Sequence, residues 1–200
     1  MISLFDLLKI GIGPSSSHTV GPMIATQRFV KSLDQTGAAQ SVVRIVIDLY
    51  GSLALTGKGH RTDRAAVLGL CGEHPRTVDP ETIDVRFAKV QSDRVLPWLG
   101  KHSIDFDIEQ DLLFHGDTFL PEHPNGIRCT AMTGSGETIL KKTYLSVGGG
   151  FVVEDNDIAD AANPLSRDHA APFPFCSAAE LLRQCNEHKL TISELVQQTN

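Results

Sequence analysis

Four small hydroxyl side chains and one imidazole occupy five consecutive positions near the N-terminus. Residues 13–22 read GPSSSHTVGP, and the polar side chains are those of Ser15, Ser16, Ser17, His18 and Thr19. A helix cap needs one hydroxyl, and Gly and Pro make turns, so capping accounts for part of this segment. Free N–H groups at a helix start, joined by several hydroxyls, can also bind a carboxylate or phosphate. Both interpretations stay open from these residues alone.

A second polar segment, GSLALTGKGHRTD at residues 51–63, places Lys58 and His60 on a glycine-rich turn beside Asp63. It is not a nucleotide-binding P-loop, because five residues separate the first two glycines and Gly59 follows the lysine. The unperturbed pKa of histidine is close to neutral, which makes His60 a candidate general base or acid. An exposed loop histidine without a catalytic role is the alternative.

Two further features limit the chemistry. The nucleophile-elbow pattern G-x-S-x-G is absent from the serine segment, which disfavours a serine hydrolase. Three consecutive glycines at residues 148–150 indicate a bend or bulge after a strand, or a close approach of the backbone to the other two loops.

The composition argues against several classes of protein. The net charge is -6 and Lys and Arg form no basic patch, which disfavours nucleic-acid binding. No apolar run approaches the roughly 20 residues of a membrane-spanning helix, and the N-terminus lacks a basic leader, so we expect a cytoplasmic protein. The cysteines are scattered without a C-x-x-C pair and are interpreted as reduced core residues: Cys71, Cys129, Cys176 and Cys185.

Hydrophobic spacing predicts the elements that hold these loops. A short helical turn is expected over residues 3–9, an amphipathic helix from Pro22 to about residue 37, and a strand over 41–50 with Val43 on its buried face. Thr62 and Asp63 are read as the cap and first-turn acid of a helix that ends at residues 71–72.

The second half of the sequence predicts further elements. We expect a helix from about residue 82 through 98, alternation at 104–108, and a hairpin of strands 127–132 and 138–147 around a Gly-Ser-Gly turn. This order favours an α+β fold in which helices pack on a mixed or antiparallel sheet.

The chain is expected to contain three regions. Residues 1–153 form the main domain, residues 154–176 have the composition of a linker, and residues 177–200 begin a helical domain. Ser177 to Glu180 and Thr191 to Glu194 are capping boxes. A final helix of about eight residues with nothing to pack on is marginal, so we expect the front part of a longer protein, or a chain that has lost its partner.

Three segments together resemble the N-terminal β domain of the iron-sulfur L-serine dehydratases, or L-serine ammonia-lyases. They are GIGPSSSHTVGPM (11–23), YGSLALTGKGHRTD (50–63) and YLSVGGGF (144–151). The resemblance implies a fold similar to an allosteric-substrate-binding domain, and a bacterial, homodimeric enzyme that converts L-serine to pyruvate and ammonia without pyridoxal phosphate. It also implies a [4Fe-4S] cluster, one iron acting as a Lewis acid, held by cysteines of an α domain and by none in this chain.

The resemblance implies roles for single residues as well. The serine segment, Ser15 to Thr19, is expected to hold the substrate's carboxylate and hydroxyl region, and His60 to remove the α-proton, with Lys58 and Asp63 nearby. The isolated chain is then expected to be inactive. The alternative is a non-catalytic regulatory module that binds a small amino acid, which would tolerate loss of His60.

Overall fold

The computed structural model describes residues 10–155, 172–173, 175 and 177–199. The described residues fall into two compact units, one of residues 10–155 and one containing the C-terminal helices. Each is described by itself. The predicted short helix at residues 3–9 and most of the predicted linker lie outside the described residues, so the three predicted regions stay a prediction.

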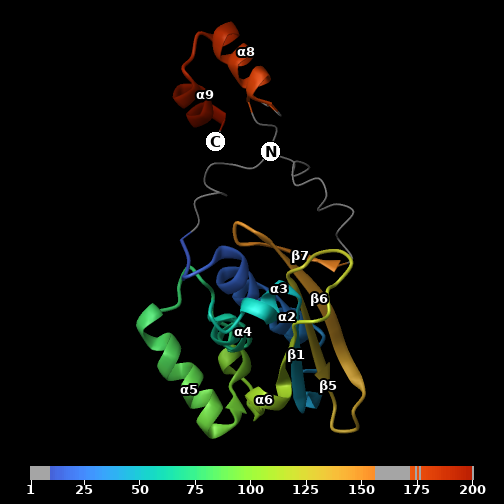
Figure 1. Cartoon of the computed structure of the whole chain (residues 1–200). Helices are drawn as coiled ribbons and strands as arrows, with labels where there is room; N and C mark the ends of the chain where they lie inside the picture. The colour runs from blue at the N-terminus through green and yellow to red at the C-terminus, as the bar shows by residue number, and fades with distance from the viewer. Residues whose placement is uncertain (1–9, 156–171, 174, 176, 200) are drawn as a thin grey trace. The chain divides into compact units, whose positions relative to one another are not determined.

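A five-stranded mixed sheet forms one layer of the larger unit (Figure 1). Its strand order is β4-β1-β5-β6-β7; β1 runs parallel to β4, and the other neighbours are antiparallel. The predicted α+β class with a mixed sheet is therefore confirmed. The strands are β1 (Arg44–Tyr50), β4 (Leu112–His115), β5 (Gly126–Met132), β6 (Thr138–Gly148) and β7 (Phe151–Glu154).

Alternate side chains of β1 form its more deeply buried face. Ile45, Ile47 and Leu49 are fully buried, because alternate side chains of a strand point to the same face. The strand begins at Arg44, later than predicted, because residues 39–41 form a turn of 3₁₀ helix. The prediction that Val43 lies on the buried face is wrong, since this side chain is 54% exposed.

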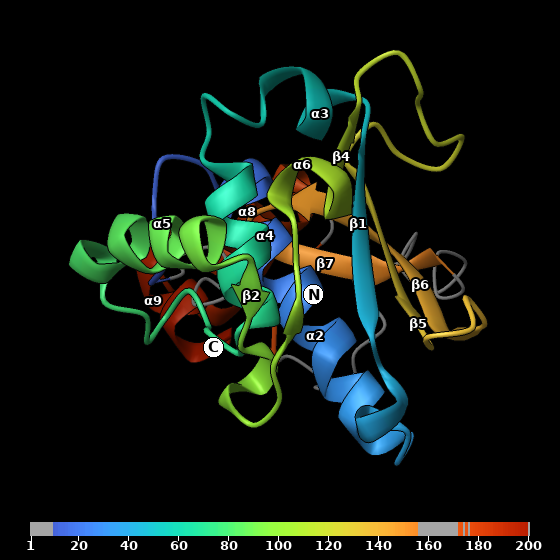
Figure 2. The ribbon, with the colours of Figure 1, turned by 90° about the horizontal axis from the view of Figure 1, so that it is seen from below.

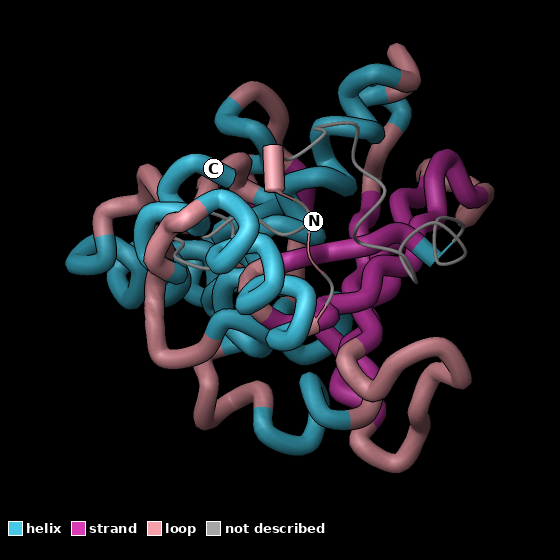
Figure 3. Tube along the Cα trace, turned by 90° about the horizontal axis from the view of Figure 1, so that it is seen from above, coloured by secondary structure: helices cyan, strands magenta, loops and turns pink. Residues whose placement is uncertain are grey.

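Three helices lie on the same side of the sheet (Figure 2), and Figure 3 shows the chain from the opposite direction with helices in cyan and strands in magenta. They are α2 (Gly21–Gln35), α4 (Thr62–Leu70) and α5 (Ile83–Asp93). Helix α2 packs on β5, β6 and β7 and against α4, burying residues such as Met23 and Phe29 at helical spacing. The two helices predicted to begin at Pro22 and near Thr62 are confirmed as α2 and α4.

Helix α5 ends five residues earlier than predicted. Arg94 takes a left-handed conformation with φ 53°, which stops the helix. The next residues form β2 (Val95–Leu96), which pairs with β3 (Ile104–Asp105). Short elements were missed by the periodicity: α3 (Ser52–Thr56), α6 (Ile108–Asp111), β4 and β7.

The hairpin and the glycine triplet agree with expectation. β5 and β6 flank the predicted turn, and Gly148, Gly149 and Gly150 all have positive φ beside a register shift in the β6–β7 pair. Among the described cysteines, Cys71, Cys129 and Cys185 are buried free thiols, as predicted, and Cys176 lies outside that set.

The smaller unit contains α8 (Ala178–His188) and α9 (Ile192–Thr199). The Ser177 hydroxyl caps α8 by accepting from the N–H of Glu180 at 3.2 Å. At α9 the capping box is complete, because Thr191 and Glu194 each accept from the other's N–H. In the part of the chain that the structure describes, no helix has the length and apolar character needed to cross a bilayer.

Candidate active site

The serine segment is wound into one turn of π-helix, Ser16–Val20, that continues directly into α2. Ser15 precedes it with extended backbone, and its Oγ accepts from the N–H of His18 at 3.2 Å. Capping therefore uses one hydroxyl, as predicted for a helix start. The remaining hydroxyls need another explanation, and π-turns are frequent at functional sites.

Pro22 explains two buried hydroxyls that lie outside the segment. Because proline has no N–H, it can donate neither to the carbonyl five residues back, Ser17, nor to the carbonyl four residues back, His18. The Ser17 carbonyl instead accepts from Oγ of Ser146 at 2.7 Å, and the His18 carbonyl accepts from Oγ1 of Thr62 at 2.6 Å. Both donors are fully buried. These bonds attach the π-turn to β6 and to α4.

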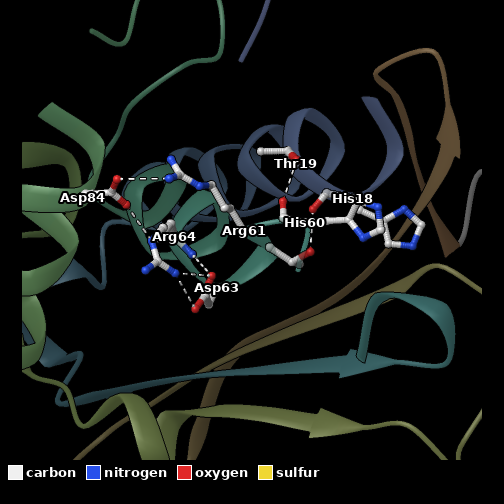
Figure 4. A network of polar contacts seen from close by, with 8 residues as sticks. His18, Thr19, His60, Arg61, Asp63, Arg64 and Asp84 are labelled. Atoms are coloured by element: carbon white, nitrogen blue, oxygen red, sulfur yellow. Dashed lines mark hydrogen bonds and ion pairs between the residues drawn. The ribbon is translucent and has the colours of Figure 1, made fainter. Parts of the chain in front are cut away.

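Thr19 adds a third bond, in which the serine segment supplies the donor. Its hydroxyl donates to the carbonyl of His60 at 2.7 Å and accepts from the N–H of Ser15 at 3.2 Å. The Thr19 side chain is 1% exposed, so its hydroxyl has a structural role: it holds the backbone that carries His60 (Figure 4). The prediction that Thr62 caps α4 is wrong. Arg61, with φ 57°, is the residue that precedes the helix, and the Thr62 hydroxyl donates to the His18 carbonyl.

These bonds bring the two predicted histidines together. The ring centroids of His18 and His60 are 4.9 Å apart with planes tilted by 41°. Nδ1 of His60 lies 3.0 Å from the carbonyl oxygen of Thr56, which can only accept. In the neutral ring Nδ1 therefore carries the proton, and Nε2 presents a lone pair with no hydrogen-bond partner among the described residues. This is the arrangement that a general base requires.

His18 has a different arrangement. Its Nδ1 is hydrogen-bonded to Oγ of Ser17 at 2.8 Å and its Nε2 to Oγ of Ser52 at 3.0 Å. Burial lowers the pKa of His18, and the nearby His60 lowers it further, against an opposing contribution from Ser52. The lowered pKa favours the neutral ring, whose two nitrogens are bonded to the two hydroxyls. Sequence reasoning missed Ser52, although it lies within the second segment.

Two of the predicted site residues face outward. Ser16 is exposed, which leaves its hydroxyl accessible. Lys58 is also exposed, and its Nζ lies 5.8 Å from the centroid of the Phe114 ring, at which distance a cation–π contact is weak.

Asp63 belongs to a separate network of charges. Its carboxylate pairs with Arg64 at 3.1 Å, and Arg64 also pairs with Asp84 at 2.7 Å. Arg61 pairs with the same Asp84 at 3.2 Å. Figure 4 shows Asp63 directed toward Arg64 and away from the two imidazoles. The structure therefore joins Asp63 to the α4–α5 contact, and the described contacts give it no bond to His60.

The third sequence segment contributes Ser146, whose backbone is bonded to a neighbouring loop. The N–H of Ser146 donates to the carbonyl of Asn125 at 3.0 Å, and Nδ2 of Asn125 donates to the carbonyl of Ser146 at 3.1 Å. The N–H of Ser52 donates to the carbonyl of Pro124 at 2.9 Å. Ser52, Pro124 and Asn125, and Ser146 thus meet through these bonds. A Cβ on Gly148 would meet nothing within 4 Å and one on Gly149 would meet only Phe151, so these two glycines do not approach the other two loops, and the bend-or-bulge interpretation of the triplet holds.

The described thiols do not fit an iron-sulfur cluster. Burial raises the pKa of Cys71 to about 12 and raises that of Cys129 as well, whereas cluster ligation requires thiolates. No three His, Cys, Asp or Glu side chains within residues 10–155 and 177–199 are grouped in a way that could hold a metal ion.

Comparison with known proteins decides the family. The family model described as "Serine dehydratase beta chain" matches residues 3–157. The chain belongs to the serine dehydratase beta-chain family. The match contains all three of the sequence segments 11–23, 50–63 and 144–151.

Curated relatives of this beta chain are L-serine dehydratases. L-serine dehydratase 1 of Escherichia coli K12 is 48% identical over 99% of this chain and 43% of the relative. L-serine dehydratase TdcG of the same organism is 47% identical over 98% and 42%, and L-serine dehydratase of Streptomyces coelicolor is 46% identical over 98% and 43%. The chain thus spans less than half the length of the curated relatives it matches.

Proposed function

We propose that the protein carrying this beta chain is an L-serine ammonia-lyase, which converts L-serine to pyruvate and ammonia. The family match and the relatives' names support this reaction class. The single observation that carries the proposal is the Nε2 lone pair of His60, which has no hydrogen-bond partner among the described residues. The Thr56 carbonyl fixes this ring, and its centroid lies 4.9 Å from that of His18 in the serine segment.

His60 acts in this proposal as the base that removes the α-proton of serine. The α-proton of an amino acid is very weakly acidic, so the base must be held in place and must be unprotonated at Nε2. The bond from Thr19 to the His60 carbonyl holds its backbone, and the bond from Nδ1 to Thr56 holds its ring. Nε2 then receives the proton.

The serine segment supplies hydroxyl and backbone donors for the substrate's carboxylate and hydroxyl region. Ser16 is exposed and Ser15 and Ser17 are half-buried, so their hydroxyls can reach a bound molecule. His18 contributes through Ser17, because both of its ring nitrogens are already hydrogen-bonded. Lys58 and Asp63 stay predicted contributors without a described contact to either ring.

The cluster belongs to the part of the protein beyond this chain in our proposal. Since the described cysteines are buried and dispersed, and burial raises the pKa values of Cys71 and Cys129, a [4Fe-4S] cluster would be held by an α portion, the partner of this chain. The predicted homodimer, the cytoplasmic location and the absence of pyridoxal phosphate, nucleic-acid and membrane partners complete the proposal.

The test is an anaerobic pyruvate assay with the complete protein and L-serine. His60→Asn keeps an amide near the Nδ1 position but has no base at Nε2, so we expect turnover to fall by about two to four orders of magnitude, with serine binding retained. His74→Asn is the matched control, because His74 lies in another loop and its Nδ1 accepts only from the N–H of Arg76.

The same comparison separates the two candidate functions. A regulatory module would bind serine equally well with and without His60 and would form no pyruvate in either case. Near-normal turnover of His60→Asn would show that another group removes the proton.

A further inference from the structure

The short helix α3 contacts both imidazoles. Its first residue, Ser52, holds Nε2 of His18 through the hydroxyl, and its last residue, Thr56, holds Nδ1 of His60 through the carbonyl. The two residues are one helical turn apart, and Oγ1 of Thr56 donates to the carbonyl of Ser52 at 2.9 Å, which closes that turn. One element therefore determines the orientation of two rings.

Helix α3 is itself attached to the sheet. Gly51, with φ 53°, donates to the carbonyls of His115 and Thr118 at 3.2 and 2.9 Å. A Cβ on Gly51 would lie 2.6 Å from the Pro124 carbonyl oxygen, so the approach requires glycine. Leu53, the second residue of α3, is fully buried. The backbone that carries Ser52 is consequently rigid.

The Ser52 hydroxyl has no capping role that would explain it. The residue before α3 is Gly51, and no side chain caps this helix. The hydrogen bond described for the Ser52 hydroxyl is the one to His18, which is 34 positions away in the sequence. Without it, Nε2 of His18 would lose its partner while Nδ1 stayed bound to Ser17, and the ring could rotate away from His60.

We propose that Ser52 is a positioning residue of the site, which holds the His18 ring so that α3 sets the orientation of both imidazoles. Its effect on turnover rests on the proposed function. Its contact with His18 does not, so the two can be tested separately.

The first measurement is an imidazole ¹⁵N spectrum of the 200-residue chain, with His18 assigned through His18→Gln. Ser52→Thr and Ser52→Val have the same shape and differ in the hydroxyl alone, so any effect of bulk on folding is shared. We expect Ser52→Val to shift the Nε2 signal of His18, and Ser52→Thr to keep the wild-type signal. Ser135→Ala, which removes an exposed hydroxyl bonded to Thr133 at 2.7 Å, is the control and should leave every signal unchanged.

The second measurement is turnover of L-serine by the complete protein. We expect Ser52→Val to lower kcat about tenfold with little change in KM, as for loss of one hydrogen bond in a positioned site, and Ser52→Thr to restore it. An unmoved Nε2 signal, or normal kcat in Ser52→Val, overturns the proposal. If the wild type forms no pyruvate, the proposed function fails, and the spectrum alone decides whether Ser52 holds His18.

Discussion

Gly21→Ala is expected to disrupt the attachment of the serine segment to the sheet. Gly21 is the first residue of α2, and a Cβ at this position would lie 1.9 Å from Oγ of Ser146 and 2.8 Å from its Cβ. Ser146 is fully buried and its hydroxyl donates to the Ser17 carbonyl. The added methyl must therefore expel that hydroxyl or push α2 away from β6.

The magnitude follows from two costs. Inserting a methyl into a packed contact costs about 1–3 kcal/mol. Breaking the Ser146 bond leaves the Ser17 carbonyl without a donor, because Pro22 cannot supply one, and this costs about 1–3 kcal/mol more. The two costs overlap, since expelling the hydroxyl relieves part of the clash. We expect the free energy of unfolding to fall by about 2–4 kcal/mol.

The assay is urea unfolding followed by the fluorescence of Trp98, the single tryptophan, which is fully buried in the larger unit. Gly134→Ala is the matched control, because its Cβ would meet only Val43 at 3.7 Å. Gly21→Ala combined with Ser146→Gly should lose less stability than the two single changes added together, by about 1 kcal/mol or more. An unfolding midpoint for Gly21→Ala equal to that of Gly134→Ala would refute the packing argument.

Two further predictions concern protonation. Burial lowers the pKa values of His18, His74 and His123, so the folded chain binds fewer protons on these rings than the unfolded chain does as pH falls below about 6.5. The urea midpoint should therefore be highest above that pH and decrease toward pH 5, and a midpoint that rises on acidification would contradict this. Because burial raises the pKa values of the Cys71 and Cys129 thiols, iodoacetamide at pH 8 should modify them only after denaturant is added. Peptide mass spectrometry measures this, and rapid labelling of the native chain would show that the two sites open.

Long periodic segments of the fold were predictable, and short ones were not. Helix α2 and strand β1 bury regularly spaced apolar side chains, and this spacing is present in the sequence. Helix α3 has five residues and β4 has four, too few for a period to be visible. The end of α5 depends on the left-handed conformation of Arg94, which the residue type does not favour and which tertiary contacts must stabilise.

The candidate site was predictable as a set of segments and less so as a set of roles. The number of hydroxyls indicated more than a cap, and His60 was placed on its turn correctly. Which way each hydroxyl points depends on contacts with distant segments, so Thr19 was expected to face the substrate and instead faces the His60 carbonyl. Pro22 was the available signal, because two carbonyls before a proline in a helix start need donors from elsewhere.

The hydroxyls divide into those that hold the backbone and those that remain near the imidazoles. Thr19, Thr62 and Ser146 are buried and each donates to a carbonyl of another segment, so they fix where the two histidines lie. Ser17 and Ser52 flank the His18 ring. A backbone fixed by buried bonds loses little entropy when a substrate binds, which is what a site for a weakly acidic proton requires. Within the serine segment, Thr19 is therefore explained by rigidity, whereas the side chains of Ser15, Ser16 and Ser17 are exposed or half-buried and remain accessible to a substrate.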